Sequence, residues 1–113
     1  MSVSIVLEPN GQMKRVNLPA NADTIPLTLD LLNAFSAEAH RIAPGVALWI
    51  DSCGFGLREV NGPATELAVR YGCVWQPYYG PVLVCGIDEE GRSRDLTADQ
   101  IRELLPYLLS LSS

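Results

Sequence analysis

Two neighbouring segments decide the fold of this chain: residues 61–68, NGPATELA, and residues 80–86, GPVLVCG. The first is typical of a helix start, because Asn61 or Gly62 can cap a helix and Pro63 suits its first position. The second is a short apolar run bounded by glycines, which predicts a buried strand. Both patterns specify structure, and neither carries a catalytic, metal-binding or phosphate-binding signature.

The N-terminal part of the chain is typical of a β-hairpin. Residues 3–8 alternate with β-rich composition, residues 9–11 are Pro-Asn-Gly, and residues 13–18 are the expected return strand. Proline presets φ in such a turn, and glycine accepts a positive φ. We therefore expect the first two strands to be antiparallel neighbours.

Apolar residues at near-helical spacing predict a first helix over residues 27–42, which Pro44 and Gly45 would end. His40 would then lie near the helix C-terminus, where it complements the helix dipole. The apolar stripe of this helix consists of Leu27, Leu31, Leu32, Phe35, Ala39 and Ile42.

Residues 46–50 show no polar alternation, which predicts a strand buried on both faces. Residues 55–60 are a candidate to pair back on that strand. The helix that begins at Pro63 is expected to end at residue 71, because Gly72 is a good residue to follow a helix.

The last helix is expected over residues 98–109. Thr97 and Gln100 match a capping box at its start. Pro106 predicts a kink or an early end near Leu105, because proline cannot donate a helical hydrogen bond. The element order predicts an α+β fold: one small domain with a mainly antiparallel sheet, an N-terminal β-hairpin and about three helices, roughly 27–42, 63–71 and 98–109.

Composition limits the classes of function. The 113 residues are 48% hydrophobic, which predicts a single domain over residues 1–113 with a compact core. The formal net charge of -5 disfavours direct binding of nucleic acid or anionic lipid and suits a basic partner surface. The apolar stretches are too short to cross a bilayer, and the N-terminus lacks a signal-peptide pattern, so we expect a soluble protein of the cytoplasm.

The reactive side chains form no recognisable site. Cys53, Cys73 and Cys85 are widely spaced and His40 is the single histidine, so neither a disulfide framework nor a zinc site is predicted. A nucleophile of Cys53 with His40 as base and Asp51 as its orienting group is conceivable, but no local signature surrounds these residues. We expect no cofactor and no metal.

The aromatic loop is the first candidate for recognition. Trp75, Tyr78 and Tyr79 lie in a proline-containing loop, and such side chains supply large contact area at small entropic cost. The alternative is that they close one end of the core. We expect them to act as apolar anchors for a partner protein.

An acidic segment is the second candidate. Asp88, Glu89 and Glu90 would form an acidic rim beside those anchors. Together with later acidic residues they could imitate nucleic-acid phosphates, although a solvated turn also explains them.

The middle and C-terminal two-thirds resemble an uncharacterised family, the domain of unknown function number thirty-eight forty-six, found in bacteriophages and bacterial mobile elements. The resemblance lies in a strand with an acidic-to-glycine turn, an Asn-x-x-Ala-Thr helix start, a Gly-x-Val-x-Val-x-Gly strand and an Asp-Glu-x-Gly turn. Cys53 and the aromatic loop have no counterpart in that pattern. The matching residues are 49–54, Asn61, Ala64, Thr65, Gly80, Val82, Val84, Gly86 and 88–91.

The resemblance implies a phage-like or mobile-element setting, in which small proteins often act by binding. We expect a non-enzymatic protein that binds and inhibits a host protein, for example a CRISPR defence component. The alternative is a protein that sequesters a nucleotide signal in a pocket at an oligomer interface, with Arg58 or Arg70 holding the phosphate. Edge strands and the apolar tail at residues 108–111 make a homodimer plausible.

Overall fold

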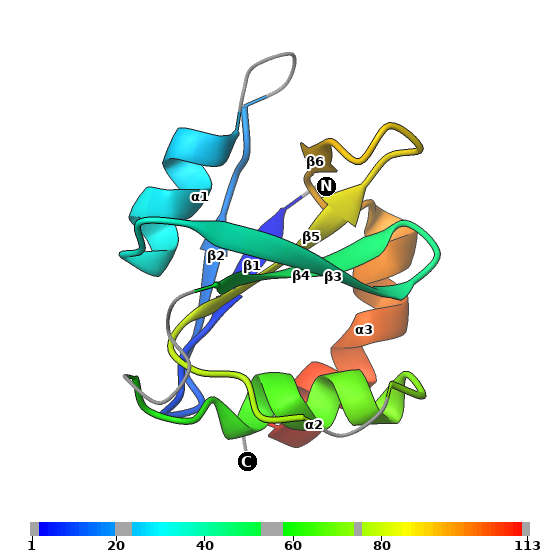
Figure 1. Cartoon of the computed structure of the whole chain (residues 1–113). Helices are drawn as coiled ribbons and strands as arrows, with labels where there is room; N and C mark the ends of the chain where they lie inside the picture. The colour runs from blue at the N-terminus through cyan, green and yellow to red at the C-terminus, as the bar shows by residue number, and fades with distance from the viewer. Residues whose placement is uncertain (1–2, 20–23, 53–57, 74–75, 112–113) are drawn as a thin grey trace.

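In the computed structural model, which describes residues 3–19, 24–52, 58–73 and 76–111, the strands form one antiparallel sheet. Its order is β2-β1-β5-β4-β3, and β6 pairs with β5 outside that path (Figure 1). The elements are β1 (Ser4–Leu7), β2 (Met13–Val16), α1 (Ile25–Leu32), β3 (Ala37–Ala43), β4 (Val46–Asp51), α2 (Gly62–Arg70), β5 (Val82–Ile87), β6 (Ser93–Arg94) and α3 (Ala98–Leu111).

Helices cover both faces of the sheet, with α1 on one face and α2 and α3 on the other (Figure 1). Leu32 of α1 packs with Trp49 and Leu83, whereas Leu67 and Leu104 pack on the opposite face. The radius of gyration is 12.7 Å, close to the value of about 13 Å expected for a compact domain of this length. The expected α+β fold with an antiparallel sheet is confirmed.

The N-terminal hairpin is also confirmed. β1 and β2 are antiparallel, with Ile5 opposite Arg15. The Gly11 N–H donates to the Glu8 carbonyl at 3.0 Å, and the φ of Gly11 is +91°. The turn therefore uses the positive φ that glycine was expected to supply.

The predicted helix over residues 27–42 is wrong in its second half. Helix α1 ends at Leu32, and Asn33 closes it in the left-handed conformation with a φ of 52°. The chain then turns and forms β3, in which His40 lies opposite Leu48 of β4. Pairing with β4 outweighs the helix propensity of the Ala, Glu and Arg residues in this segment. His40 is consequently a strand residue and lies at no helix terminus.

The strand predicted at residues 46–50 is confirmed as β4, which is paired on both sides, with β3 and β5. The prediction that residues 55–60 pair back on it is therefore wrong for the described part of that segment. Val60 instead forms a bridge with Tyr79. Residues 53–57 lie outside the described part of the chain.

The two later helices begin as expected. The Asn61 side chain accepts from the Ala64 N–H at 3.0 Å at the start of α2, and Gly72 follows that helix with a φ of +87°. At the start of α3, Thr97 N–H donates to the Gln100 side chain at 3.0 Å and Gln100 N–H donates back to the Thr97 hydroxyl at 3.1 Å. This reciprocal pair is the predicted capping box.

Helix α3 continues through Pro106 to Leu111, so of the predicted kink or early end near Leu105 the early end is wrong. The Leu105 side chain is 46% exposed, whereas Leu104 and Leu108 are buried against the sheet. Within the described ranges, no helix has the length and apolar composition that a membrane-spanning segment requires.

Candidate partner-binding surface

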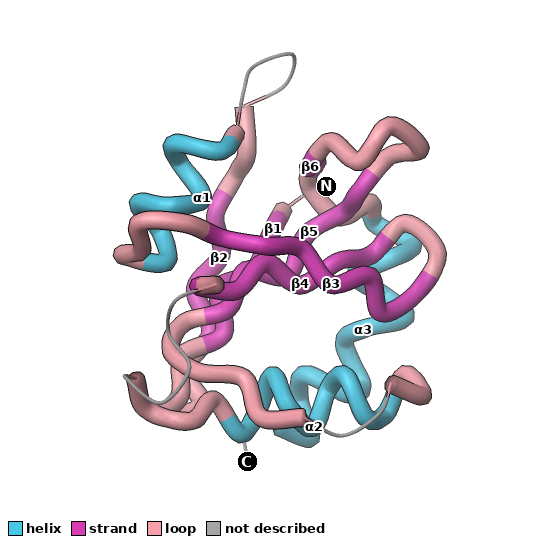
Figure 2. Tube along the Cα trace, in the orientation of Figure 1, coloured by secondary structure: helices cyan, strands magenta, loops and turns pink. Residues whose placement is uncertain are grey.

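Phe35 is the most exposed large apolar side chain in the described part of the chain. It is 99% exposed, whereas Leu105 and Ile25 are 46% and 43% exposed. It lies in the turn between α1 and β3, drawn in pink in Figure 2. Burying a phenylalanine side chain stabilises a fold by about 1.5–3 kcal/mol, and this one makes no such contribution. Helical spacing predicted that Phe35 belongs to a buried apolar stripe, and that prediction is wrong.

The turn that carries Phe35 is fixed on both sides. Before Phe35, the Ala34 N–H donates to the Leu29 carbonyl of α1 at 2.9 Å. After Phe35, the Ser52 N–H donates to the Ser36 carbonyl at 3.1 Å, which extends the pairing of β3 and β4 by one residue. Because the backbone is tied to two elements, the exposed ring is attached to a rigid support.

Arg58 ties this turn to the rest of the molecule. Its Nε lies 2.8 Å from an Asp51 carboxylate oxygen, and its guanidinium also donates to the Asn33 carbonyl. Its stem crosses Gly80, where an added Cβ would lie 2.6 Å from the Arg58 Cδ. The φ of Gly80 is +74°, so glycine is required here for both conformation and space.

The same end of the sheet carries further apolar groups. Val60 is 49% exposed and bridges the half-buried Tyr79. The end of β4 lies beside the start of β5, because Trp49 pairs with Leu83. We define the aromatic end as Phe35, Arg58, Val60 and Tyr79. It combines apolar side chains with an ion pair that is largely buried, since the Arg58 and Asp51 side chains are 27% and 7% exposed.

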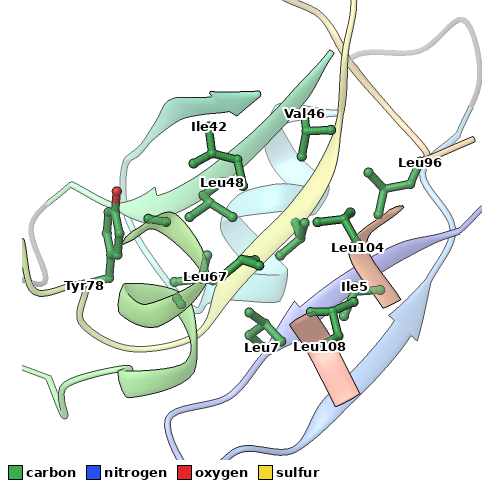
Figure 3. Packing of buried hydrophobic residues seen from close by; sticks show 14 residues of the cluster. Ile5, Leu7, Ile42, Val46, Leu48, Leu67, Tyr78, Leu96, Leu104 and Leu108 are labelled. Carbon is green, nitrogen blue, oxygen red and sulfur yellow. The ribbon is translucent and has the colours of Figure 1, made fainter. Parts of the chain in front are cut away.

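The predicted aromatic anchors lie in different environments. Trp75 lies outside the described residues, and Tyr79 belongs to the aromatic end. Tyr78 is 3% exposed and packs in the core beside Leu67, with its hydroxyl directed away from that leucine (Figure 3). Its side chain closes the core, which was the alternative reading of this loop.

Tyr78 also forms part of a polar group with His40. The Tyr78 hydroxyl lies 3.4 Å from the His40 Nδ1 and 3.3 Å from the Gln76 Nε2. The His40 Nε2 lies 3.5 Å from a Glu38 carboxylate oxygen. This group was not visible in the sequence, because its four residues come from two distant segments.

The predicted acidic rim is largely neutralised by neighbouring arginines. The backbone N–H of Arg92, together with the Arg94 side chain, holds the pKa of the Asp88 carboxyl below its ordinary value. Arg92 also pairs with Glu90. Three carboxylates (Asp88, Glu89 and Glu90) and two guanidinium groups leave a net charge of -1 on this turn.

The acidic turn and the aromatic loop lie at opposite ends of β5. Tyr79 precedes Val82, whereas Asp88 follows Ile87. Six strand residues span about 20 Å, so the two groups do not form the adjacent anchors and rim that the sequence suggested.

The two arginines of the nucleotide alternative are already paired. Arg58 holds Asp51 at 2.8 Å, and Arg70 lies 3.7 Å from Glu66 on the surface of α2. Arg58 precedes α2 and Arg70 is its last residue, and the nine residues of α2 span about 14 Å. One phosphate would therefore be held by one of the two arginines, as the alternative states, and not by both.

The described residues do not bring His40 and Asp51 together, as a catalytic group of Cys53, His40 and Asp51 would require. Asp51 pairs with Arg58, and in the strand register it lies opposite Ala37, three positions from His40. Residues at odd and even positions of a strand point to opposite faces, so Asp51 and His40 face different sides of the sheet. Cys53 lies outside the described residues.

The two described cysteines are buried to different degrees. Cys73 is half-buried, and Cys85 is fully buried, which raises the pKa of its thiol to about 11. Among the described residues, no group of three or more His, Cys, Asp or Glu side chains could hold a metal ion.

Comparison of the chain with protein-family models, curated proteins and solved structures gave no match. The geometry of the aromatic end is therefore the basis for any statement about function.

Proposed function

We propose that this chain is a non-catalytic binding protein that docks on another protein through its aromatic end. The observation that carries the proposal is the 99% exposure of Phe35 on a turn held by both α1 and β4. Because the backbone of this turn is already held, a partner that covers the ring has to order only its two side-chain torsions. The ion pair of Arg58 and Asp51, together with the bond from Arg58 to the Asn33 carbonyl, holds this turn in place beside the ring.

The partner that suits this surface has an apolar pocket for the phenyl ring and a surface of positive charge. The first requirement comes from Phe35, and the second from the formal net charge of -5. In its narrower form, the proposal is a phage or mobile-element protein that acts in the cytoplasm of a bacterial host and inhibits a host defence component. That narrower form rests on the sequence resemblance described above alone, since no family model matches the chain.

The proposal is tested by comparing immobilised variants with a lysate of the candidate host. Phe35→Ala removes the exposed ring and, because the ring has no intramolecular contacts to lose, should leave stability within about 0.5 kcal/mol of wild type. Leu105→Ala is the matched control, since it truncates an exposed apolar side chain on α3. We expect wild type and Leu105→Ala to retain the same protein, and Phe35→Ala to retain at least about tenfold less, which corresponds to a loss of about 1.4 kcal/mol.

The retained protein would then be purified and its affinity for each variant measured. Equal affinity for wild type and Phe35→Ala would refute the aromatic end as the binding surface. Retention of no protein by wild type would refute the binding role itself. Tyr79→Ala serves as a second variant of the same surface, whereas Tyr78→Ala is unsuitable because Tyr78 is part of the core.

A further inference from the structure

The outer edge of β3 has free backbone groups. β3 is the last strand in the sheet order, and among the described strands only β4 pairs with it. The Ser52 N–H donates to the Ser36 carbonyl, so these two residues form a hydrogen-bonded pair. Such pairs alternate along antiparallel strands, and Glu38 and His40 therefore bond to β4. The residues whose backbone N–H and C=O point outward are Ala37, Ala39 and Arg41.

We propose that this edge binds a second copy of the chain, and that two β3 strands pair antiparallel about Ala39. In this register Ala39 lies opposite its own counterpart, and Ala37 lies opposite Arg41 of the second copy. The outward groups of these residues would then form about six backbone hydrogen bonds between the copies. The inference goes beyond the proposed function and does not rest on it.

In this register, the β3 side chains of one copy are complementary to the β3 side chains of the other copy. Glu38 of one copy lies opposite His40 of the other, in a non-hydrogen-bonded pair, where side chains approach most closely. The two side chains already lie 3.5 Å apart within one chain, so an imidazole and a carboxylate are compatible neighbours here. On the other face, the short Ala37 leaves room for the long Arg41 of the second copy.

The structure also limits pairing to two copies. The pairing of β3 with β4 is irregular between Arg41 and Ala43, and the exposed Pro44 follows. Bulges and prolines blunt a strand edge, so the pairing stops after Arg41. The opposite edge, β2, presents the consecutive cations Lys14 and Arg15, which would repel in a second copy. A two-fold interface at one edge closes on itself and forms a dimer.

The experiment measures the mass of the native particle at about 50 μM, a concentration at which a micromolar dimer is populated. The chain mass is 12.3 kDa, so wild type should give twice this value. Ala39→Pro removes one outward N–H and no described intramolecular hydrogen bond, and it should give the mass of a single chain. Arg102→Glu on the exposed surface of α3 is the control and should remain dimeric.

A second set of variants changes the charges of Glu38 and His40. The test then does not depend on whether the proline variant folds. His40→Glu places two carboxylates opposite each other and should weaken dimerisation at least about tenfold. The double variant Glu38→Lys/His40→Glu restores opposite charges across the interface and should restore the dimer. Thermal unfolding followed by circular dichroism shows whether each variant is folded.

A wild-type mass of one chain at this concentration would overturn the proposal. A dimer whose dissociation constant is unchanged in both Ala39→Pro and His40→Glu would also overturn it, because the interface would then lie elsewhere. Phe35 lies before the paired segment 37–41, so the mass of Phe35→Ala is measured as well and is expected to be that of a dimer. The two proposals can therefore fail separately.

Discussion

Asn61 shows how one polar side chain can connect three elements. Its Oδ1 accepts from the Ala64 N–H of α2, and its Nδ2 donates to the carbonyls of Leu7 at 2.9 Å and Gly80 at 2.8 Å. The residue is fully buried, so its side-chain amide has to find its hydrogen-bond partners inside the protein. The helix start at Asn61 was predictable from local sequence, whereas its bonds to β1 and the start of β5 depend on the tertiary fold.

Asn61→Asp should destabilise the protein by about 3 kcal/mol at pH 7, because it keeps the cap acceptor and removes both donors. Burial beside two carbonyl oxygens should raise the pKa of the new carboxyl above its ordinary value. A raised pKa in the folded state means that the loss of stability is smallest in acid and grows as the pH rises. Urea unfolding at pH 4 and pH 7 measures this difference.

The control for that variant is Asn10→Asp. The Asn10 side chain is exposed, and its oxygen accepts from the Gln12 N–H, so an aspartate can replace it. We expect its stability to stay within about 0.5 kcal/mol of wild type. An Asn61→Asp variant as stable as Asn10→Asp would show that the two donated bonds contribute nothing.

Exposure of single side chains was the least predictable property. Phe35 and Tyr78 are both aromatic residues near turns, yet one is 99% and the other 3% exposed. Helical spacing from Leu27 and Leu31 predicted that Phe35 is buried. Helix α1 ends at Leu32, so helical spacing does not apply at position 35. An asparagine at position 33, which tolerates the left-handed conformation, was the available signal of that end.

At the scale of elements, capping and turn residues were reliable guides and apolar periodicity was not. The starts of α2 and α3 and the N-terminal hairpin were predicted from Asn61, Thr97 and Gly11. β3 was missed, because an edge strand with alanines on one face and polar residues on the other gives a weak alternation. Only its partner β4 shows that residues 37–43 are extended.

Pro106 provides a prediction at this scale. It lies in the interior of α3, where its nitrogen cannot donate to the carbonyl of Arg102. Pro106 is exposed, so replacement by alanine loses no core packing. Pro106→Ala should therefore raise the free energy of unfolding by about 1–3 kcal/mol.

The matched control is Pro26→Ala at the start of α1, where proline is compatible with the helix. We expect no gain there, and a small loss because alanine enlarges the conformational freedom of the unfolded chain. Urea unfolding of both variants measures the contrast. A Pro106→Ala variant less stable than wild type would mean that the proline contributes a contact or a kink on which α3 depends.

At the scale of the whole molecule, β5 is the centre of the fold. It pairs with β1 on one side and β4 on the other, and helices cover both of its faces. Cys85 lies in this strand with no exposed surface, and burial raises the pKa of its thiol from 9.0 to about 11. A thiol in this state is protonated at neutral pH and inaccessible to reagents. The contribution of this group to stability is present below pH 9 and is lost as the pH rises from 9 to 11.

Because β5 cannot open without separating the layers, Cys85 should react with a thiol reagent only when the whole domain unfolds. In a Cys53→Ser/Cys73→Ser background at pH 8, the opening free energy from labelling rates should equal that from urea unfolding within about 1 kcal/mol. A Cys53→Ser/Cys85→Ala variant, which leaves the half-buried Cys73, should react at least about a hundredfold faster. Comparable rates for Cys85 and Cys73 would show that the centre of the sheet opens locally, and that the two faces do not form one cooperative unit.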